Sequence, residues 1–305
     1  MELLMKKQGQ IRWLCAMVLL TACCFRTAAV LKDQEVLPVA VSEGKEYSIM
    51  LYKKPVFKWE PLTFDASFVE IDNRSRSDYD LSELLDRPFA FPHTDEPTVL
   101  ILHTHATEAY ADTEGYRSED PKENMVAIGA QMAEILNRAG IRTLHDTTLH
   151  DAYGYSDAYE RVEGVIAEYL QEYPKICMVI DVHRDAVENA DGSQRPMSTT
   201  LSGEEMAQLL LVMGTDTDEL PHPNWEENLS FAVKLQAYIG ESAPDLFRNI
   251  SLRSARYNEH MSPYSILLEV GSAGNTQDQA LRSATYFAQK LSTLLLSADS
   301  LLPSG

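Results

Sequence analysis

Cysteine is scarce in this chain of 305 residues. It has four cysteines, and three of them, Cys15, Cys23 and Cys24, lie close to the N-terminus. The fourth, Cys177, stands inside an apolar run, where a thiol is typical of a hydrophobic core. A disulfide framework and a cysteine metal cluster are therefore excluded. A nucleophilic role for Cys177 is disfavoured as well, because it falls in the middle of a predicted strand rather than at its end.

Positive charge is also in short supply. Lysine and arginine together number 26 against 46 aspartates and glutamates, which gives a formal net charge of −20. Binding to a phosphate backbone needs clustered basic side chains, and the sequence contains no basic run. We therefore expect no nucleic-acid partner. The acidity favours solubility but does not by itself identify a partner.

Long hydrophobic runs are missing too. The most prominent apolar run, Trp13 to Phe25, has 13 residues and follows several basic residues, as in an export signal. A bilayer span usually needs about 20 residues. For residues 1–26 three readings stay open: a cleaved signal peptide, a short signal-anchor, or a lipoprotein signal in which "LTAC" makes Cys23 the lipidated residue. All three place the rest of the chain at the extracytoplasmic face of the cell membrane.

The remainder divides into two parts by composition. Residues 27–96 are rich in charge and proline, which predicts an extracytoplasmic spacer with one short helix at 79–88. From residue 97 to about 300, apolar strands alternate with amphipathic helices, which predicts the catalytic domain. This alternation predicts an α/β fold with a mainly parallel or mixed central sheet and helices on both faces. The predicted strands are 98–103, 141–144, 175–183, 197–203, 208–214 and 264–271, and the predicted helices are 123–140, 156–173, 224–241 and 276–298.

Common catalytic motifs are absent from the sequence. It contains no H-E-x-x-H, no G-x-S-x-G, no G-x-x-x-x-G-K and no G-x-G-x-x-G. What it does contain is a set of polar residues at the ends of three apolar strands. Because ligands bind beyond the carboxyl ends of strands in such sheets, we expect these residues to meet at one edge. They are His103, His105 and Glu108 after the first strand, Asp181 and His183 at the second, and Glu269 on the third.

This set suits a catalytic Zn²⁺, which takes three nitrogen or oxygen ligands and leaves one position for water. His105 and Glu108, three residues apart in a tight turn, point to one side, and His183 supplies the third ligand. Zinc lowers the pKa of its bound water to about 7, which makes a nucleophile for amide hydrolysis. Glu269 is then the general base and general acid. Asp181 is placed to hold the second nitrogen of a ligating imidazole.

Some assignments have alternatives. His103 is an alternative first ligand, or a residue that supports the ligands or faces the substrate. The stretch "LHDTTLHD", residues 144–151, is expected to be a solvated loop, although it could also form the rim of the cleft. Arg184, Arg253 and Arg256 are candidates to bind the carboxylates of a peptide, with ordinary surface ion pairs as the competing interpretation.

Four blocks of this sequence resemble one family. "ILHTHATEAY", "VIDVHRDA", "HPNWEENLSFAVKLQ" and "LLEVGSAGNTQDQA" are similar to the stage II sporulation protein P family of endospore-forming bacteria, in the same order, from about residue 97 to 296. The N-terminal hydrophobic segment and spacer fit that family's layout. A lipidated Cys23 would depart from it, because the family's expected anchor is a plain transmembrane segment.

The resemblance implies a peptidoglycan hydrolase of the sporulating cell. Members resemble zinc-dependent N-acetylmuramoyl-L-alanine amidases, with an additional endopeptidase activity attributed to the family. They act between mother cell and forespore during engulfment, with a membrane-anchored lytic transglycosylase, stage II sporulation protein D, as partner. The implied fold is zinc amidase/carboxypeptidase-like. It implies His105, Glu108 and His183 as metal ligands and Glu269 as the catalyst.

Two rival functions remain at this level. A zinc carboxypeptidase acting on wall peptides would use the same ligands but would need an arginine for the terminal carboxylate. A non-catalytic peptidoglycan-binding scaffold of the engulfment complex would need neither metal nor Glu269. Wall digestion products discriminate the first rival, and metal content discriminates the second.

Overall fold

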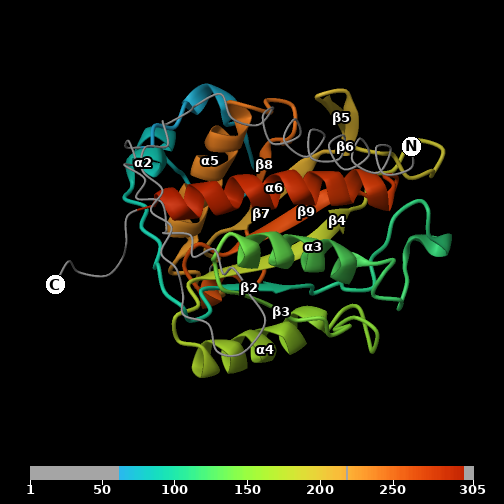
Figure 1. Ribbon diagram of the computed structural model, residues 1–305, viewed down its shortest axis with the longest axis horizontal. Coiled ribbons are helices and arrows are strands. Elements are labelled where there is room, and N and C mark those ends of the chain that lie inside the picture. The colour runs from blue at the N-terminus through green and yellow to red at the C-terminus, as the bar shows by residue number, and fades with distance from the viewer. Residues whose placement is uncertain (1–61, 218, 299–305) are drawn as a thin grey trace, which may run out of the picture. The chain divides into compact units, whose positions relative to one another are not determined.

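The computed structural model describes residues 62–217 and 219–298 (Figure 1). The predicted export segment 1–26, with Cys23, and residues 27–61 of the predicted spacer lie outside the described residues. Within the described ranges, none of the helices has both the length and the apolar character that crossing a bilayer requires.

A central sheet of seven strands organises the fold, in the spatial order β1-β8-β7-β9-β4-β2-β3. β3, β2, β4 and β9 run parallel to one another, β7 pairs antiparallel with β9, and β8 and β1 follow the direction of β7. The fold is therefore mixed α/β, as predicted. The strands are β1 (Ile71–Asn73), β2 (Val99–Leu102), β3 (Thr143–His145), β4 (Met178–Asp185), β7 (Leu209–Gly214), β8 (Ile250–Arg253) and β9 (Ile266–Ser272), and a separate hairpin contains β5 (Ser198–Leu201) and β6 (Glu204–Ala207).

The helices cover the two faces of this sheet unequally. α3 (Met125–Arg138), α5 (Trp225–Gly240) and α6 (Gln277–Ser297) pack into one large core with the sheet, and α3 lies beside α6 in Figure 1. α4 (Ala158–Glu172) packs on the other face, over the apolar side chains of β2 and β4. The short helix α2 (Leu81–Asp86) packs against α5. Helices on both faces confirm the prediction, but one face is only partly covered.

Local sequence accounts for these elements. β2 is the run VLIL, buried along its whole length, as expected of a strand covered on both faces. The Asn124 side chain accepts a hydrogen bond from the Val126 N–H and so caps α3. Thr276 and Gln279 form a capping box at the start of α6. The helices that follow β2 and β9 therefore begin at defined residues, which fixes the two loops after these strands at the carboxyl edge of the sheet.

Residues 62–96, which the composition assigns to a spacer, contribute to the same sheet and core. β1 pairs parallel with β8, and Leu84 and Phe91 are buried in the large core. The short helix predicted at 79–88 is present as α2. A strand of three residues is too short to show an alternating pattern in the sequence, which explains why β1 escapes a reading based on periodicity.

Candidate active site

Strand direction brings the predicted site residues to one edge. Because β2, β4 and β9 are parallel neighbours, their carboxyl ends lie together. Leu102 pairs with Asp181, and His183 pairs with Glu269 on the next strand. The turn that follows β2 carries His105 and Glu108 to the same place.

His183 lies between two carboxylates. Its Nδ1 is 3.7 Å from Glu108 Oε2, and its Nε2 is 2.9 Å from Asp181 Oδ1. Burial disfavours the imidazolium, but Asp181 and Glu108 outweigh this effect and raise the pKa of His183 well above its ordinary value. This arrangement places one ring nitrogen beside an orienting carboxylate and the other beside a potential co-ligand.

His105 occupies the opposite wall of the same cluster. Its ring stacks on Tyr155 with centroids 3.8 Å apart, and it lies edge-on to the His183 ring at 5.4 Å. Its Nδ1 is buried, has no hydrogen-bond partner in the described part of the chain, and lies 4.0 Å from Asp151 Oδ2. Burial, together with His183, lowers the pKa of His105. A neutral imidazole with a free nitrogen is the form that binds a metal.

The carboxylates are themselves held in place. Asp181 accepts hydrogen bonds from the backbone N–H and the hydroxyl of Thr104, at 2.8 and 2.6 Å. Thr107 makes the same pair of bonds to Asp151, at 3.1 and 2.7 Å. The guanidinium of Arg117 adds a bond of 3.0 Å to Asp151.

Arg184 holds the carboxylate of Glu108 in place. Its backbone N–H donates to Glu108 Oε2 at 3.3 Å, and its Nη1 lies 3.6 Å from Glu108 Oε1. Its side chain also donates to the carbonyls of Ala109 and Tyr116. Arg184 is therefore buried, and its guanidinium is occupied by Glu108 and two backbone carbonyls, so it is not free to bind a peptide carboxylate.

His103 points away from this cluster. Its Nδ1 is 3.0 Å from the carbonyl of Val182, and its Nε2 is 2.8 Å from Nε2 of His145. A Cβ added at Gly129 of α3 would lie 2.5 Å from that same His103 nitrogen, so the pair packs directly against the helix. Burial lowers the pKa of His103 to about 3 and that of His145 to about 4, so both imidazoles are neutral. The structure thus separates His103 from the other predicted site residues.

Glu269 is the only carboxylate on β9, and it faces the open side of the sheet. Its Oε2 is buried and has no hydrogen-bond partner among the described residues. Desolvation, opposed in part by His183, raises the pKa of Glu269 to about 8. A carboxyl group tuned in this way can take up and release a proton near neutral pH.

The donor set is of the type that binds zinc, but its atoms do not close around a single point. In residues 62–217 and 219–298, no group of three or more His, Cys, Asp or Glu side chains has the geometry of a metal site. The fit lies in the pairing of His183 Nδ1 with Glu108 Oε2 and in the free buried nitrogen of His105. Imidazole and carboxylate are ligands that zinc accepts.

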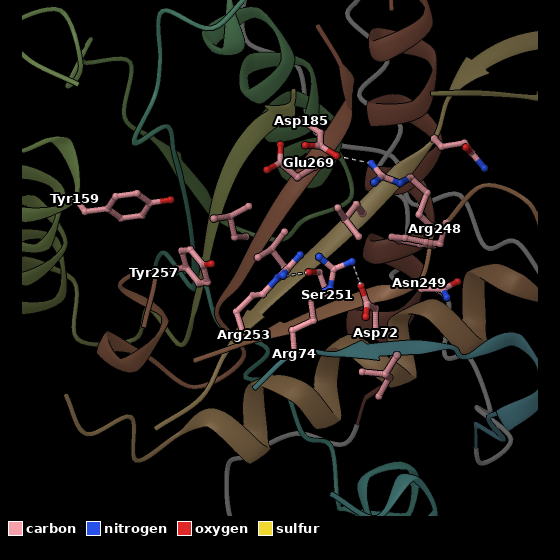
Figure 2. Close-up of a pocket in the computed structure, with 16 residues that line it drawn as sticks. Asp72, Arg74, Tyr159, Asp185, Arg248, Asn249, Ser251, Arg253, Tyr257 and Glu269 are labelled. Atoms are coloured by element: carbon pink, nitrogen blue, oxygen red, sulfur yellow. Dashed lines mark hydrogen bonds and ion pairs between the residues drawn. The ribbon is translucent and has the colours of Figure 1, made fainter. Parts of the chain in front are cut away.

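A groove of about 1020 Å³ extends from Glu269 across the sheet. Figure 2 shows Glu269 and Asp185 at one end with Arg248 beside them, Tyr159 and Tyr257 along one side, and Arg253 and Arg74 further along. It occupies the part of the face that α4 leaves uncovered, over β9, β7, β8 and β1. The floor is therefore sheet, and the walls are loops together with Tyr159 from the first turn of α4.

Several residues of the site were not singled out from the sequence. Asp151 belongs to the stretch expected as a solvated loop, yet it is buried beside His105. Tyr155 stacks on His105, and Tyr159 stacks on His183 with centroids 6.4 Å apart. The clustering of Asp and His at 145–151 was the available signal for Asp151. The tyrosines gave none, because aromatic residues at the start of a helix are commonly surface or core.

The comparison with protein families decides the relationship. The family model "Stage II sporulation protein P (SpoIIP)" matches residues 65–292, which is well over half of the chain. The chain belongs to the stage II sporulation protein P family. The resemblance carried by the four sequence blocks is thus confirmed.

One relative and two solved structures illustrate the similarity. "Stage II sporulation protein P" of Bacillus subtilis (strain 168) is 24% identical over 221 residues, 67% of this chain, and the chain spans only 53% of that relative. The N-acetylmuramoyl-L-alanine amidase AmiC2 of Nostoc punctiforme is 17% identical with a TM-score of 0.38, covering 65% of this chain and 95% of that one. The CwlD amidase from Clostridioides difficile, in complex with the GerS lipoprotein, is 13% identical with a TM-score of 0.40, covering 66% and 95%. Structural likeness at this level carries no argument about activity.

Proposed function

We propose that this SpoIIP-family chain is a zinc-dependent N-acetylmuramoyl-L-alanine amidase that cleaves the bond between glycan and peptide in peptidoglycan during sporulation. The observation that carries the proposal is the convergence of His105, Glu108 and His183 beside Glu269, at the mouth of an open groove. We leave His103 out of the proposed ligand set because its ring nitrogens lie within hydrogen-bond distance of the Val182 carbonyl and of His145.

The chain's own residues divide the chemistry among them. His105, Glu108 and His183 would hold the Zn²⁺. When bound, that ion lowers the pKa of its water to about 7 and polarises the amide carbonyl. Glu269 takes the proton of the attacking water and returns it to the nitrogen of the leaving peptide. Its raised pKa makes the carboxyl able to serve in both directions.

Other residues position these groups. Asp181 lies 2.9 Å from Nε2 of His183 and orients its ring, so that Nδ1 faces Glu108. Arg184 holds Glu108 from its backbone N–H and its guanidinium. Tyr155 fixes the plane of the His105 ring by stacking. These contacts restrict the side chains of the three proposed ligands to a narrow range of orientations.

The open groove is what supports action on a wall polymer. Because it continues past Glu269 over several strands, a bond inside a branched chain can be brought to the site. This also supports a second, endopeptidase activity on cross-links within the same proposal. A carboxypeptidase instead needs a cation one residue beyond the scissile bond, and Arg248, at the Glu269 end of the groove, is already paired with Asp185 at 2.6 Å.

Purified full-length protein and purified cell walls test the proposal. Wild-type protein is expected to carry about one equivalent of zinc and to release glycan while exposing new N-terminal alanine. His183→Ala should lose both zinc and activity. Glu269→Gln should keep the zinc and lose roughly 10²- to 10⁴-fold in rate, the usual contribution of a general acid–base.

Three results would contradict this proposal. Released C-terminal amino acids without new N-terminal alanine would indicate the carboxypeptidase. Wall binding without lysis, and without metal in the wild type, would indicate the scaffold. Full activity in Glu269→Gln would remove Glu269 from its assigned role.

Partner and location complete the proposal. We propose, from family membership, that the protein acts in the space between mother cell and forespore beside the membrane-anchored lytic transglycosylase, stage II sporulation protein D. Residues 1–26 would attach it to the membrane, either as a span or through a lipid on Cys23. Membrane fractionation of the wild type against Cys23→Ser discriminates the two modes, because only the lipid is lost in that variant.

A further inference from the structure

The groove contains an arginine whose charge is not neutralised by a neighbouring carboxylate. Three arginines line it. Arg74 is paired with Asp72 at 2.8 Å, and Arg248 is paired with Asp185 at 2.6 Å. Arg253, in contrast, makes no ion pair within the described part of the chain. This difference singles out Arg253 as the cation that is available to a ligand.

The one side-chain bond of Arg253 fixes its direction. Its Nε donates to the hydroxyl of Ser251 at 2.7 Å, two residues back on the same strand, β8. Both side chains line the groove, and Figure 2 shows them pointing into it. The bond uses Nε and leaves the two Nη groups, which are the pair that receives a carboxylate side by side.

A strained loop places an aromatic wall next to this arginine. Tyr257 and Asn258 both have positive φ, 48° and 58°, a conformation that non-glycine residues rarely adopt. The Asn258 side chain anchors the loop by donating to the carbonyl of Tyr159 at 2.8 Å. The Tyr257 and Tyr159 rings then lie 6.1 Å apart along the groove. Retained strain of this kind is typical of ligand-binding segments.

Strand register gives the separation of Arg253 from the reacting end. Glu269 pairs with Leu210 on β7, and Gly214, further along β7, pairs with Arg253 on β8. From Leu210 to Gly214 there are four residue steps, which span roughly 13 Å along the strand. The two strand spacings across the sheet add roughly 10 Å at right angles, so the α-carbons of Glu269 and Arg253 lie roughly 16 Å apart. An extended peptide of four to five residues covers about 13 to 18 Å.

From this geometry we propose that Arg253 binds a carboxylate near the distal end of the stem peptide and so sets which peptides enter the site. The inference rests on the proposed function, because Glu269 marks the end at which the amide reacts. The carboxylate is either the C-terminal one or the side-chain carboxylate of the third residue. The extended peptide lies along Tyr159 and Tyr257, on the floor made by β7 and β8.

Peptide binding by a non-cleaving protein tests the proposal without depending on catalysis. Full-length Glu269→Gln protein is titrated with fluorescent stem tetrapeptides in three forms: both carboxylates free, the C-terminus amidated, and the third residue's carboxylate amidated. Adding Arg253→Ala should weaken binding of the free form at least tenfold, since charged bidentate bonds are among the strong ones. Adding Arg253→Lys should restore part of it.

The control is Arg256→Ala, which removes an equal charge three residues away. Arg256 pairs with Glu163 at 3.8 Å and does not line the groove, so binding should change less than twofold. One of the two amidated peptides should bind the Glu269→Gln protein as weakly as the free peptide binds the protein that also carries Arg253→Ala. The carboxylate amidated in that peptide is then the one that Arg253 binds. Equal losses in Arg253→Ala and Arg256→Ala, or full binding of both amidated peptides, would overturn the proposal.

Catalysis separates this inference from the proposed function. On walls, Arg253→Ala in the otherwise wild-type chain should raise KM with little change in kcat, because the bond is made before and during the reaction alike. If the wild type releases no N-terminal alanine while the tetrapeptide still requires Arg253, the amidase proposal fails and the binding site stands. A fall in kcat alone, with unchanged peptide binding, would overturn the role of Arg253.

Discussion

Two pairs of histidines lie at the carboxyl edge of the sheet, where β2, β3 and β4 end, and only one pair suits a metal. His103 and His145 face α3, 2.8 Å apart, and their nitrogens bond to each other and to a carbonyl. His105 and His183 face the open edge and are surrounded by carboxylates. Burial keeps the first pair neutral, whereas the carboxylates around the second pair orient the rings and supply the negative charge that the proposed zinc site requires. Neighbouring charge, rather than the presence of imidazole, thus distinguishes the proposed ligands from the buried pair.

The sharpest break between the pairs is expected in metal content. His105→Ala should lose the bound zinc and reduce wall hydrolysis by more than roughly 10³-fold, because both the activated water and its template disappear. His103→Gln should retain about one equivalent of zinc and most of the activity. Metal analysis and N-terminal alanine release on the same samples measure both. Zinc loss in His103→Gln with retention in His105→Ala would reverse the assignment.

A smaller effect is expected when an orienting carboxylate is removed. Asp181→Asn keeps the shape of the side chain but cannot polarise His183, so zinc affinity should fall by about 10- to 100-fold. Competition with a chelator gives this number. The matched control is Asp185→Asn, whose carboxylate pairs with Arg248 instead of a site histidine and whose loss should leave zinc affinity unchanged.

The inert pair should respond to crowding rather than to chemistry. In Gly129→Ala the new methyl group would lie 2.5 Å from His103 and 2.6 Å from His145, so the rings or the helix must move. Overpacking of this kind costs about 1 to 3 kcal/mol in the free energy of unfolding. Urea unfolding measures the loss, and activity per folded molecule should stay within about twofold of wild type. Gly164→Ala on α4, where a Cβ would meet no atom, is the control. A stability loss there of the same size would refute the steric explanation.

The inert pair should also make stability depend on pH. His145 has an ordinary pKa of 6.5, lowered to about 4 by burial. Below pH 6.5 the imidazole of His145 binds a proton in the unfolded chain, whereas in the folded chain it stays neutral until about pH 4. The contribution of His145 therefore lowers the stability as the pH drops through this range. The slope from this one group reaches about 1.4 kcal/mol per pH unit. In chelated protein, His145→Gln should reduce the slope between pH 6.5 and 4 by that amount. An unchanged slope would show that His145 is protonated in the folded state.

Much of this fold and site follows from the sequence alone. The three strand ends, their shared edge and the residues His105, Glu108, His183 and Glu269 come from the rule that parallel strands present their carboxyl ends together. The four long helices were also located within a few residues, because their apolar spacing and caps are strong signals. The roles assigned to these four residues in metal binding and catalysis stay predictions until bound zinc and reaction products are measured.

Other features had no sequence signal. β1 and β8 are short and pair only through tertiary contact, and an apolar run such as β7 does not reveal its direction. The direction of the His103 side chain depends on the path of the chain after β2, which ends at Leu102. His222 stands between two prolines in the sequence, and it is fully buried next to Glu259. In each case packing against distant residues, rather than local pattern, decides the outcome.

Because α4 covers only part of one face of the sheet, the shape of the molecules that the groove can accept is affected. A closed tunnel accepts a polymer only by its free end, and a cross-linked mesh offers few ends. A trench open along its length lets a strand of the mesh be laid in sideways while it stays tethered at both ends. The uncovered half of the sheet therefore suits this chain to material that cannot be threaded.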